Sequence, residues 1–158
     1  MPELDLSTVH ETVRTIVASQ PARERTYLLE ILHAVQDAFG HVPIEAAEAI
    51  RREIGVPVAD VYTLVTFYDL LTSHPTGAQT VHLCEDLVCQ MHGADALAAL
   101  LTEIVGTEGE VRGDGWISWH RCSCLGLCDK APAALVGHSA QAPVSDASLR
   151  ELASQHHE

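Results

Sequence analysis

Apolar residues in the first half of the chain recur every three or four positions, which is the period of an amphipathic α-helix. The stripe is clearest where Leu28, Leu32, Val35 and Phe39 share one face, and Gly40 then provides a C-terminal cap. Short loops between such helices indicate a small helical bundle. The pattern predicts four helices, at residues 8–20, 25–39, 43–55 and 57–68.

A cluster of turn-forming residues, Ser73–Gly77, separates this half from a second half with a different period. Alternating residues 79–83 predict a strand that ends at Cys84, and the elements that follow are a helix, strands and a second helix. We therefore predict an α+β protein, with a helical bundle over residues 1–73 and a small α/β domain over residues 74–158. The later elements are expected at residues 91–105, 116–119, 133–136 and 146–154.

The net charge is −13, and each half of the chain carries 11 acidic residues against four or five basic ones. This charge disfavours binding to nucleic acid or to anionic lipid. The first twenty residues do not resemble a signal or transit peptide, and no apolar run is long enough to span a bilayer. We therefore expect a cytoplasmic protein, in which clustered cysteines are metal ligands or redox-active thiols rather than disulfides.

Four cysteines in the second half form two close pairs, Cys84 with Cys89 and Cys124 with Cys128. Each pair lies where a predicted strand ends, which is a poor position for cysteines that only fill a core. Structural zinc sites and redox-active dithiols usually use Cys-x-x-Cys, but the gaps here are four and three residues. Zinc is retained as a second interpretation, whereas a disulfide-exchange enzyme is disfavoured.

An iron-sulfur centre is the third interpretation, because four thiolates are the usual ligands of a 2Fe-2S cluster. Gly126, between Cys124 and Cys128, can adopt backbone angles closed to other residues and so direct amide N–H groups toward sulfur. Acidic residues beside the pairs, such as Glu85 and Asp129, oppose the extra negative charge of reduction. They predict a low reduction potential.

The order Cys-x4-Cys, a spacer of 34 residues and Cys-Leu-Gly-x-Cys-Asp-x-Ala-Pro resembles the thioredoxin-like 2Fe-2S family. That family includes the E-type subunit of respiratory complex I, the gamma subunit of NAD-dependent formate dehydrogenases and a diaphorase subunit of bidirectional hydrogenases. The similarity begins upstream of the cysteines, at Leu32–Gly40 and Thr66–Tyr68, and covers roughly residues 28–137.

The resemblance implies a helical docking domain followed by a thioredoxin-like domain, with the cluster on Cys84, Cys89, Cys124 and Cys128. It also implies a partner, a flavoprotein subunit that carries FMN, a 4Fe-4S cluster and the NADH site. The chain is then expected to be a non-catalytic electron-transfer subunit of an NAD(H)-dependent oxidoreductase, exchanging single electrons with the partner's FMN. The sequence does not distinguish whether the complex is complex I, formate dehydrogenase or hydrogenase.

Other residues and other classes of protein stay open as alternatives. Cys122 adds a fifth thiol two residues before Cys124, although the family's spacing favours Cys124 as the ligand. His82 and His120 lie near the cysteine loops, but four thiols are already present and we expect both histidines to be structural. The rival functions are a zinc-binding or metal-free docking module, and a free-standing thioredoxin-like ferredoxin that forms homodimers.

Overall fold

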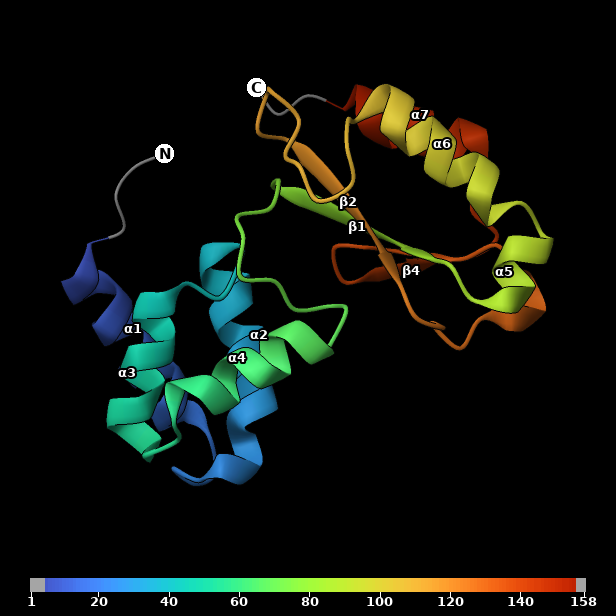
Figure 1. The fold of residues 1–158 in the computed structure, drawn as a ribbon. Coiled ribbons are helices and arrows are strands. Elements are labelled where there is room, and N and C mark those ends of the chain that lie inside the picture. Colours follow the sequence, from blue (N-terminus) through green and yellow to red (C-terminus); the bar gives the residue numbers. More distant parts are fainter. Residues whose placement is uncertain (1–4, 156–158) are drawn as a thin grey trace. The chain divides into compact units, whose positions relative to one another are not determined.

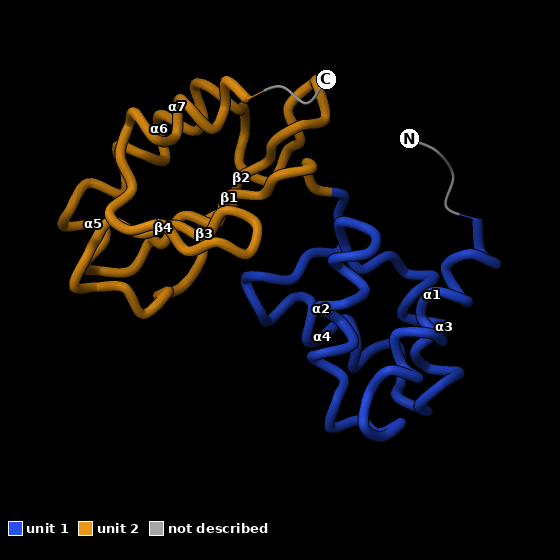
Figure 2. The backbone as a smooth tube through the Cα atoms, turned by 180° about the vertical axis from the view of Figure 1, so that it is seen from behind, with its two compact units in different colours: residues 1–75 blue, residues 76–158 orange. Residues whose placement is uncertain are grey.

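The computed structural model describes residues 5–155, and the chain divides into two compact units, residues 1–75 and residues 76–158 (Figure 2). The described part of the first unit is helical, whereas the second combines a sheet with helices. Each unit has its own buried hydrophobic core. Below they are called unit 1 and unit 2.

Unit 1 is a helical bundle with short connections (Figure 1). Its elements are α1 (Leu6–Ser19), η1 (Arg25–Tyr27), α2 (Leu28–Phe39), α3 (Ile44–Ile54) and α4 (Val58–Phe67). Helix α1 packs against α2 and α3, and α4 packs against the same two helices. The buried residues of α1, Val9, Val13 and Val17, repeat every four positions and face the core.

The ends of these helices are set by local capping groups. Gly40 and Gly55 have φ angles of 74° and 75°, and both terminate helices in the left-handed conformation that glycine adopts without strain. Helix α1 begins at Leu6 rather than at Thr8, because the carboxylate of Asp5 accepts hydrogen bonds from the Ser7 N–H and from the Ser7 and Thr8 hydroxyls.

Unit 2 contains a four-stranded mixed sheet, which confirms the α+β prediction. The strand order is β2-β1-β3-β4, with β1 and β2 parallel and the other two pairings antiparallel. The elements are β1 (Gln79–Cys84), α5 (Leu87–Met91), α6 (Ala94–Ile104), β2 (Ile117–Cys122), η2 (Cys128–Lys130), β3 (Ala134–Val136), β4 (Ser139–Gln141) and α7 (Asp146–Ser154).

Helices α6 and α7 pack together and cover one face of this sheet (Figure 1). Val81 and Leu83 of β1 and Trp119 of β2 point into the resulting core, where all three are almost completely buried. The indole Nε1 of Trp119 donates a hydrogen bond of 2.8 Å to the carbonyl of Gly106, so its polar group is satisfied. The core therefore fixes β1 and β2 side by side.

Three elements of unit 2 differ from the sequence prediction. Strand β2 runs from Ile117 to Cys122 and not over residues 116–119, so it includes Cys122. The single helix expected at residues 91–105 is divided, because Gly93 has a φ of 93° and separates α5 from α6. Cys89 therefore lies within the short helix α5 and not in a loop before a helix. Strand β4 was not predicted, since it has three residues and no alternating apolar pattern.

Candidate metal centre

The parallel pairing of β1 and β2 brings the cysteines to one edge of the sheet. Cys84, the last residue of β1, is in register with Cys122, the last residue of β2. The chain passes from Cys84 into α5, which contains Cys89, and from Cys122 into a loop that contains Cys124 and Cys128. Ligand sites in open α/β sheets usually lie beyond the carboxyl ends of parallel strands, as these loops do.

The thiols form two pairs that differ in exposure. Cys84 and Cys89 are buried, whereas Cys124 and Cys128 are exposed, with their Sγ atoms 3.4 Å apart. The thiol of Cys128 interacts electrostatically with Cys84 and Cys89, so the two pairs are neighbours. Within residues 5–155, no three His, Cys, Asp or Glu side chains are grouped as ligands of one metal ion. Two pairs of thiols fit a centre with two irons, in which each iron takes two thiolates.

Two of the four thiols have raised pKa values. Burial raises the pKa of Cys89, and its hydrogen bond with Cys84 adds to the effect. The pKa of Cys128 is raised mainly by its hydrogen bond with Cys124. Because metal ions bind thiolates, occupation of the site releases protons from these groups.

The backbone around the thiols is held by short-range interactions. The Asp86 carboxylate accepts a hydrogen bond of 2.7 Å from the Leu87 N–H and so caps α5. Gly126 has a φ of 75°, and a Cβ atom there would meet nothing within 4 Å. Glycine is therefore required at this position for its backbone conformation and not for space.

Cys122 lies in the sheet and not in the loop that carries Cys124. It is buried, and its carbonyl accepts a hydrogen bond of 3.0 Å from the N–H of Glu85. The N–H of Cys84 donates to the carbonyl of Ala133, also at 3.0 Å. Cys84 is thus held between two strands, and Cys122 forms part of the sheet that holds it. Its exclusion from the ligand set stays a prediction.

His82 and His120 occupy paired positions on β1 and β2, and their rings stack with centroids 5.7 Å apart and an interplanar angle of 23°. Alternation along the strands places them on the same face as Cys84 and Cys122. Burial lowers the pKa of His120, while the nearby Glu108 carboxylate partly offsets that effect. The histidine pair is therefore a feature of the sheet face next to the cysteines.

Arg121 was missed by the sequence analysis. Its guanidinium forms ion pairs with Glu85, which follows Cys84, and with Asp95 of α6 and Glu108 of the loop before β2. These partners come from three separate segments, so no local sequence pattern identifies the group.

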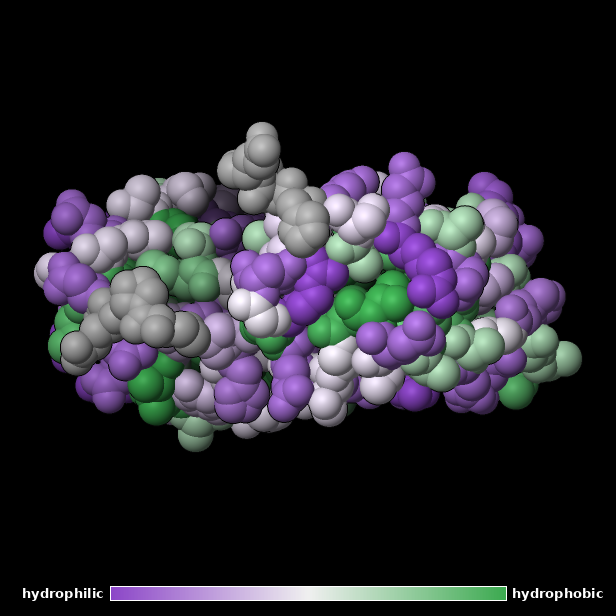
Figure 3. Space-filling view, turned by 90° about the horizontal axis from the view of Figure 1, so that it is seen from above, coloured by the Kyte–Doolittle hydropathy of each residue, from purple (hydrophilic) through white to green (hydrophobic). Residues whose placement is uncertain are grey.

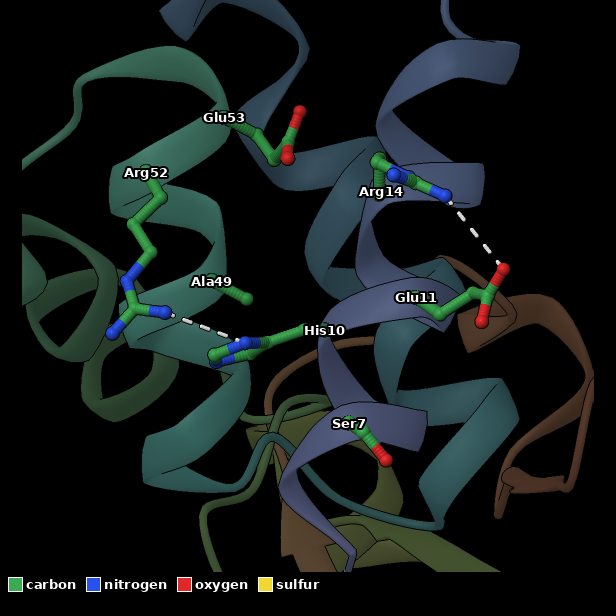
Figure 4. A pocket seen from close by; sticks show the side chains of 7 residues that line it. All are labelled: Ser7, His10, Glu11, Arg14, Ala49, Arg52 and Glu53. Atoms are coloured by element: carbon green, nitrogen blue, oxygen red, sulfur yellow. Dashed lines mark hydrogen bonds and ion pairs between the residues drawn. The ribbon is translucent and has the colours of Figure 1, made fainter.

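Unit 1 contains a pocket of about 390 Å³ between α1 and α3 (Figure 4). A guanidinium nitrogen of Arg52 lies 3.3 Å from Nδ1 of His10, and Arg14 lies 3.6 Å from Glu11. Figure 4 shows both contacts among the side chains that line the pocket. Because the charged groups lining it are of both signs, the pocket has no convergent charge for a ligand.

Figure 3 shows hydrophilic residues spread over the face in view, with hydrophobic residues in smaller patches. Between Asp5 and Gln155, none of the helices has the length and apolar character needed to cross a bilayer.

A mixed sheet covered by helices on one face, with two cysteine pairs at the carboxyl ends of its parallel strands, defines an α+β protein with four thiols gathered at one edge of the sheet. The chain belongs to the thioredoxin-like 2Fe-2S ferredoxin family, whose model matches residues 13–157. The match confirms the family inferred from the cysteine motif and, at the level of the family, a 2Fe-2S cluster as the cofactor.

Relatives of this chain are named as subunits of larger enzymes. The NADP-reducing hydrogenase subunit HndA of Solidesulfovibrio fructosivorans is 29% identical over 94% of this chain and 86% of its own length. An E-type subunit of the NADH-quinone oxidoreductase of Rhizobium meliloti is 33% identical over 82% of this chain and 77% of its own. The E-type subunit of the Escherichia coli enzyme is 30% identical over 81% of this chain and 78% of its own length. These names agree with the predicted class, whereas the formate dehydrogenase type stays a prediction.

A solved structure shares the fold. The structure of an NAD⁺-reducing NiFe-hydrogenase in its H₂-reduced state aligns with a TM-score of 0.67 and 23% sequence identity. The alignment covers 80% of this chain and 21% of the hydrogenase chain, so this protein corresponds to about a fifth of that chain.

Proposed function

We propose that the protein is an electron-transfer subunit of an NAD(P)H-linked oxidoreductase and that Cys84, Cys89, Cys124 and Cys128 hold its 2Fe-2S cluster. The observation that carries the proposal is the parallel pairing of β1 with β2, which brings both thiol pairs to one edge of the sheet. The names of the relatives support the same class of protein. A bound 2Fe-2S cluster supplies one-electron transfer.

The residues of this chain bind the cofactor and control its surroundings. Cys84 and Cys89 are buried and so keep water from one side of the site, whereas Cys124 and Cys128 lie at the surface, where electrons can enter or leave. Strand pairing fixes Cys84, and the left-handed Gly126 shapes the exposed loop. The chain performs no bond-making chemistry in this proposal.

The proposed partner is a flavoprotein subunit that carries FMN, a 4Fe-4S cluster and the NADH site, in a cytoplasmic complex. Leu87 and Met91 support a partner at this edge, because they are 67% and 76% exposed and lie one turn apart on α5, on either side of Cys89 in sequence. Exposed apolar side chains of this size are typical of the centre of a protein interface. Complex I, hydrogenase and formate dehydrogenase remain alternative complexes.

The ligand assignment is tested by a matched pair of variants, Cys124→Ser and Cys122→Ser. We expect Cys122→Ser to retain about two irons per chain and the visible absorbance of a 2Fe-2S centre, whereas Cys124→Ser loses iron. Iron and sulfide analysis with EPR of the reduced proteins measures both. The reverse result contradicts the assignment, and a colourless wild-type protein with bound zinc supports the docking-module alternative.

The docking proposal is tested by exchanging the exposed residues of α5. We expect Leu87→Gln with Met91→Gln to weaken binding to the flavoprotein subunit at least about tenfold, which is 1.4 kcal/mol, without changing the iron content. Ala99→Gln is the control, since Ala99 is also exposed and apolar but lies on α6 of the same unit, outside the expected docking domain. Purification of the native complex identifies the companion subunit, and equal binding by all three proteins contradicts the proposed surface.

A further inference from the structure

One arginine connects three acidic residues, one of which, Glu85, directly follows Cys84. Nε of Arg121 lies 3.3 Å from Glu108, and one terminal nitrogen lies 3.6 Å from Asp95 and 3.7 Å from Glu85. The N–H of Arg121 also donates a hydrogen bond of 2.8 Å to Glu108. Three like charges at one place are unfavourable without a cation, so Arg121 is the group that allows them to converge.

This group is connected directly to the cysteine site. Glu85 is the residue after Cys84, and its N–H donates to the carbonyl of Cys122 while its carboxylate contacts Arg121. Residues of β2 therefore hold both the backbone and the side chain of Glu85. The side chain of Arg121 is only 36% exposed, so its charge is screened less than that of a fully solvated residue.

We infer that Arg121 is a positioning residue for the connection between β1 and α5, Glu85 and Asp86, and raises the reduction potential of the cluster. The inference rests on the proposed function, because it requires a cluster bound at Cys84. Reduction adds one negative charge to the cluster, and the carboxylate of Glu85, the residue after Cys84, opposes that charge. Arg121 contacts this carboxylate and offsets its charge. The low potential expected from the acidic residues alone is therefore moderated by one basic residue.

The test compares Arg121→Gln with Arg150→Gln. Arg150 also pairs with two carboxylates, Glu103 and Asp146, but it lies on α7. We expect Arg121→Gln to lower the equilibrium constant for one-electron reduction by about tenfold, which corresponds to 59 mV. Arg150→Gln is expected to leave the potential unchanged. Potentiometric titration followed by EPR of the full chain measures the potentials.

Two further variants separate charge from packing. Arg121→Lys retains the positive charge but lacks the planar fork that contacts several carboxylates, so we expect a potential close to that of the wild type with lower thermal stability. Glu85→Gln removes the acid that Arg121 offsets and is expected to raise the potential. It also keeps the inference testable if Arg121→Gln fails to fold.

The outcomes distinguish this inference from the proposed function. Wild-type protein without iron or a 2Fe-2S EPR signal overturns the proposed function, and with it the basis of the inference. Intact clusters with equal potentials in the wild type and Arg121→Gln overturn the inference alone. An unchanged or lowered potential in Glu85→Gln overturns it as well, whether or not Arg121→Gln folds.

Discussion

Gly77, which precedes β1, provides the sharpest test of how unit 2 is packed. Its N–H donates a hydrogen bond of 3.0 Å to the hydroxyl of Ser118, a completely buried residue of β2. A Cβ atom at Gly77 would lie 2.6 Å from the carbonyl carbon of Ile117 and 2.7 Å from its Cα. Gly77→Ala therefore places a methyl group against the backbone of β2 at its first residue, Ile117.

The cost of this substitution follows from these distances. Non-bonded carbon atoms normally lie about 3.5–4.0 Å apart, so the methyl group is about 1 Å too close, and backbone atoms cannot rotate away as a side chain can. If the chain before β1 moves away, it loses the hydrogen bond to Ser118 and the bond of 2.7 Å from the Gln79 N–H to the Trp116 carbonyl. Overpacking costs about 1–3 kcal/mol and each lost hydrogen bond about 1 kcal/mol. We expect a loss of about 2–3 kcal/mol, which lowers the melting temperature by roughly 10 °C.

The assay uses tryptophan fluorescence during thermal unfolding. Both tryptophans of the chain, Trp116 and Trp119, lie in unit 2, so their emission reports the unfolding of that unit. Gly113→Ala is the control, because a Cβ atom there meets nothing within 4 Å. By restricting the unfolded chain, Gly113→Ala is expected to be neutral or stabilising by up to about 1 kcal/mol. If the two alanine variants melt at the same temperature, the steric reasoning is wrong.

Three further predictions concern local groups. Burial lowers the pKa of His120, so as the pH falls below about 6.5 the unfolded chain binds this proton before the folded protein does, and stability is lost. His120→Gln should therefore lose less stability over this pH range than the wild type. An unchanged profile of melting temperature against pH contradicts this. Hydrogen bonds from Ser7 and Thr8 lower the pKa of Asp5, so the Asp5 carboxylate contributes stability above about pH 4 that is lost as the pH falls further. Asp5→Asn should therefore have a lower melting temperature than the wild type at neutral pH but not in acid. The same difference in melting temperature at both pH values would exclude the effect. Gln36→Ala should cost about 1–3 kcal/mol in urea unfolding, because the amide of Gln36 bonds the Leu70 carbonyl at 2.6 Å and the Thr72 N–H at 2.8 Å; coincident urea curves would refute it.

The features that could be predicted from the sequence depend on neighbouring residues. The apolar stripe of residues 28–39 and the glycine at position 40 specify a helix and its end without reference to the rest of the chain. The cysteine motif identified the family for a similar reason, since its spacing is local and specific. The same holds for α7, which begins at Asp146 as predicted, because Ser145 and Ser148 form a capping box.

The features that could not be predicted depend on residues distant in sequence. The convergence of Glu85, Asp95 and Glu108 on Arg121 requires the folded sheet, because the four residues come from separate segments. The burial of Cys84 and Cys89 and the exposure of Cys124 and Cys128 likewise depend on the folded surroundings of each pair and not on its spacing. Helix α5, with five residues, is too short to show a helical period.

Because β1 and β2 pair in parallel, the positions of the two cysteine pairs do not depend on the number of residues between them. Strand register, and not the number of intervening residues, determines where Cys84 and Cys122 lie. The turn at residues 113–115 is at the opposite end of β2 from Cys122. We therefore expect that lengthening the chain there, for example with a labelling tag or a flexible linker, costs loop entropy and the local hydrogen bonds of Asp114 and Gly115 but leaves the thiols in place.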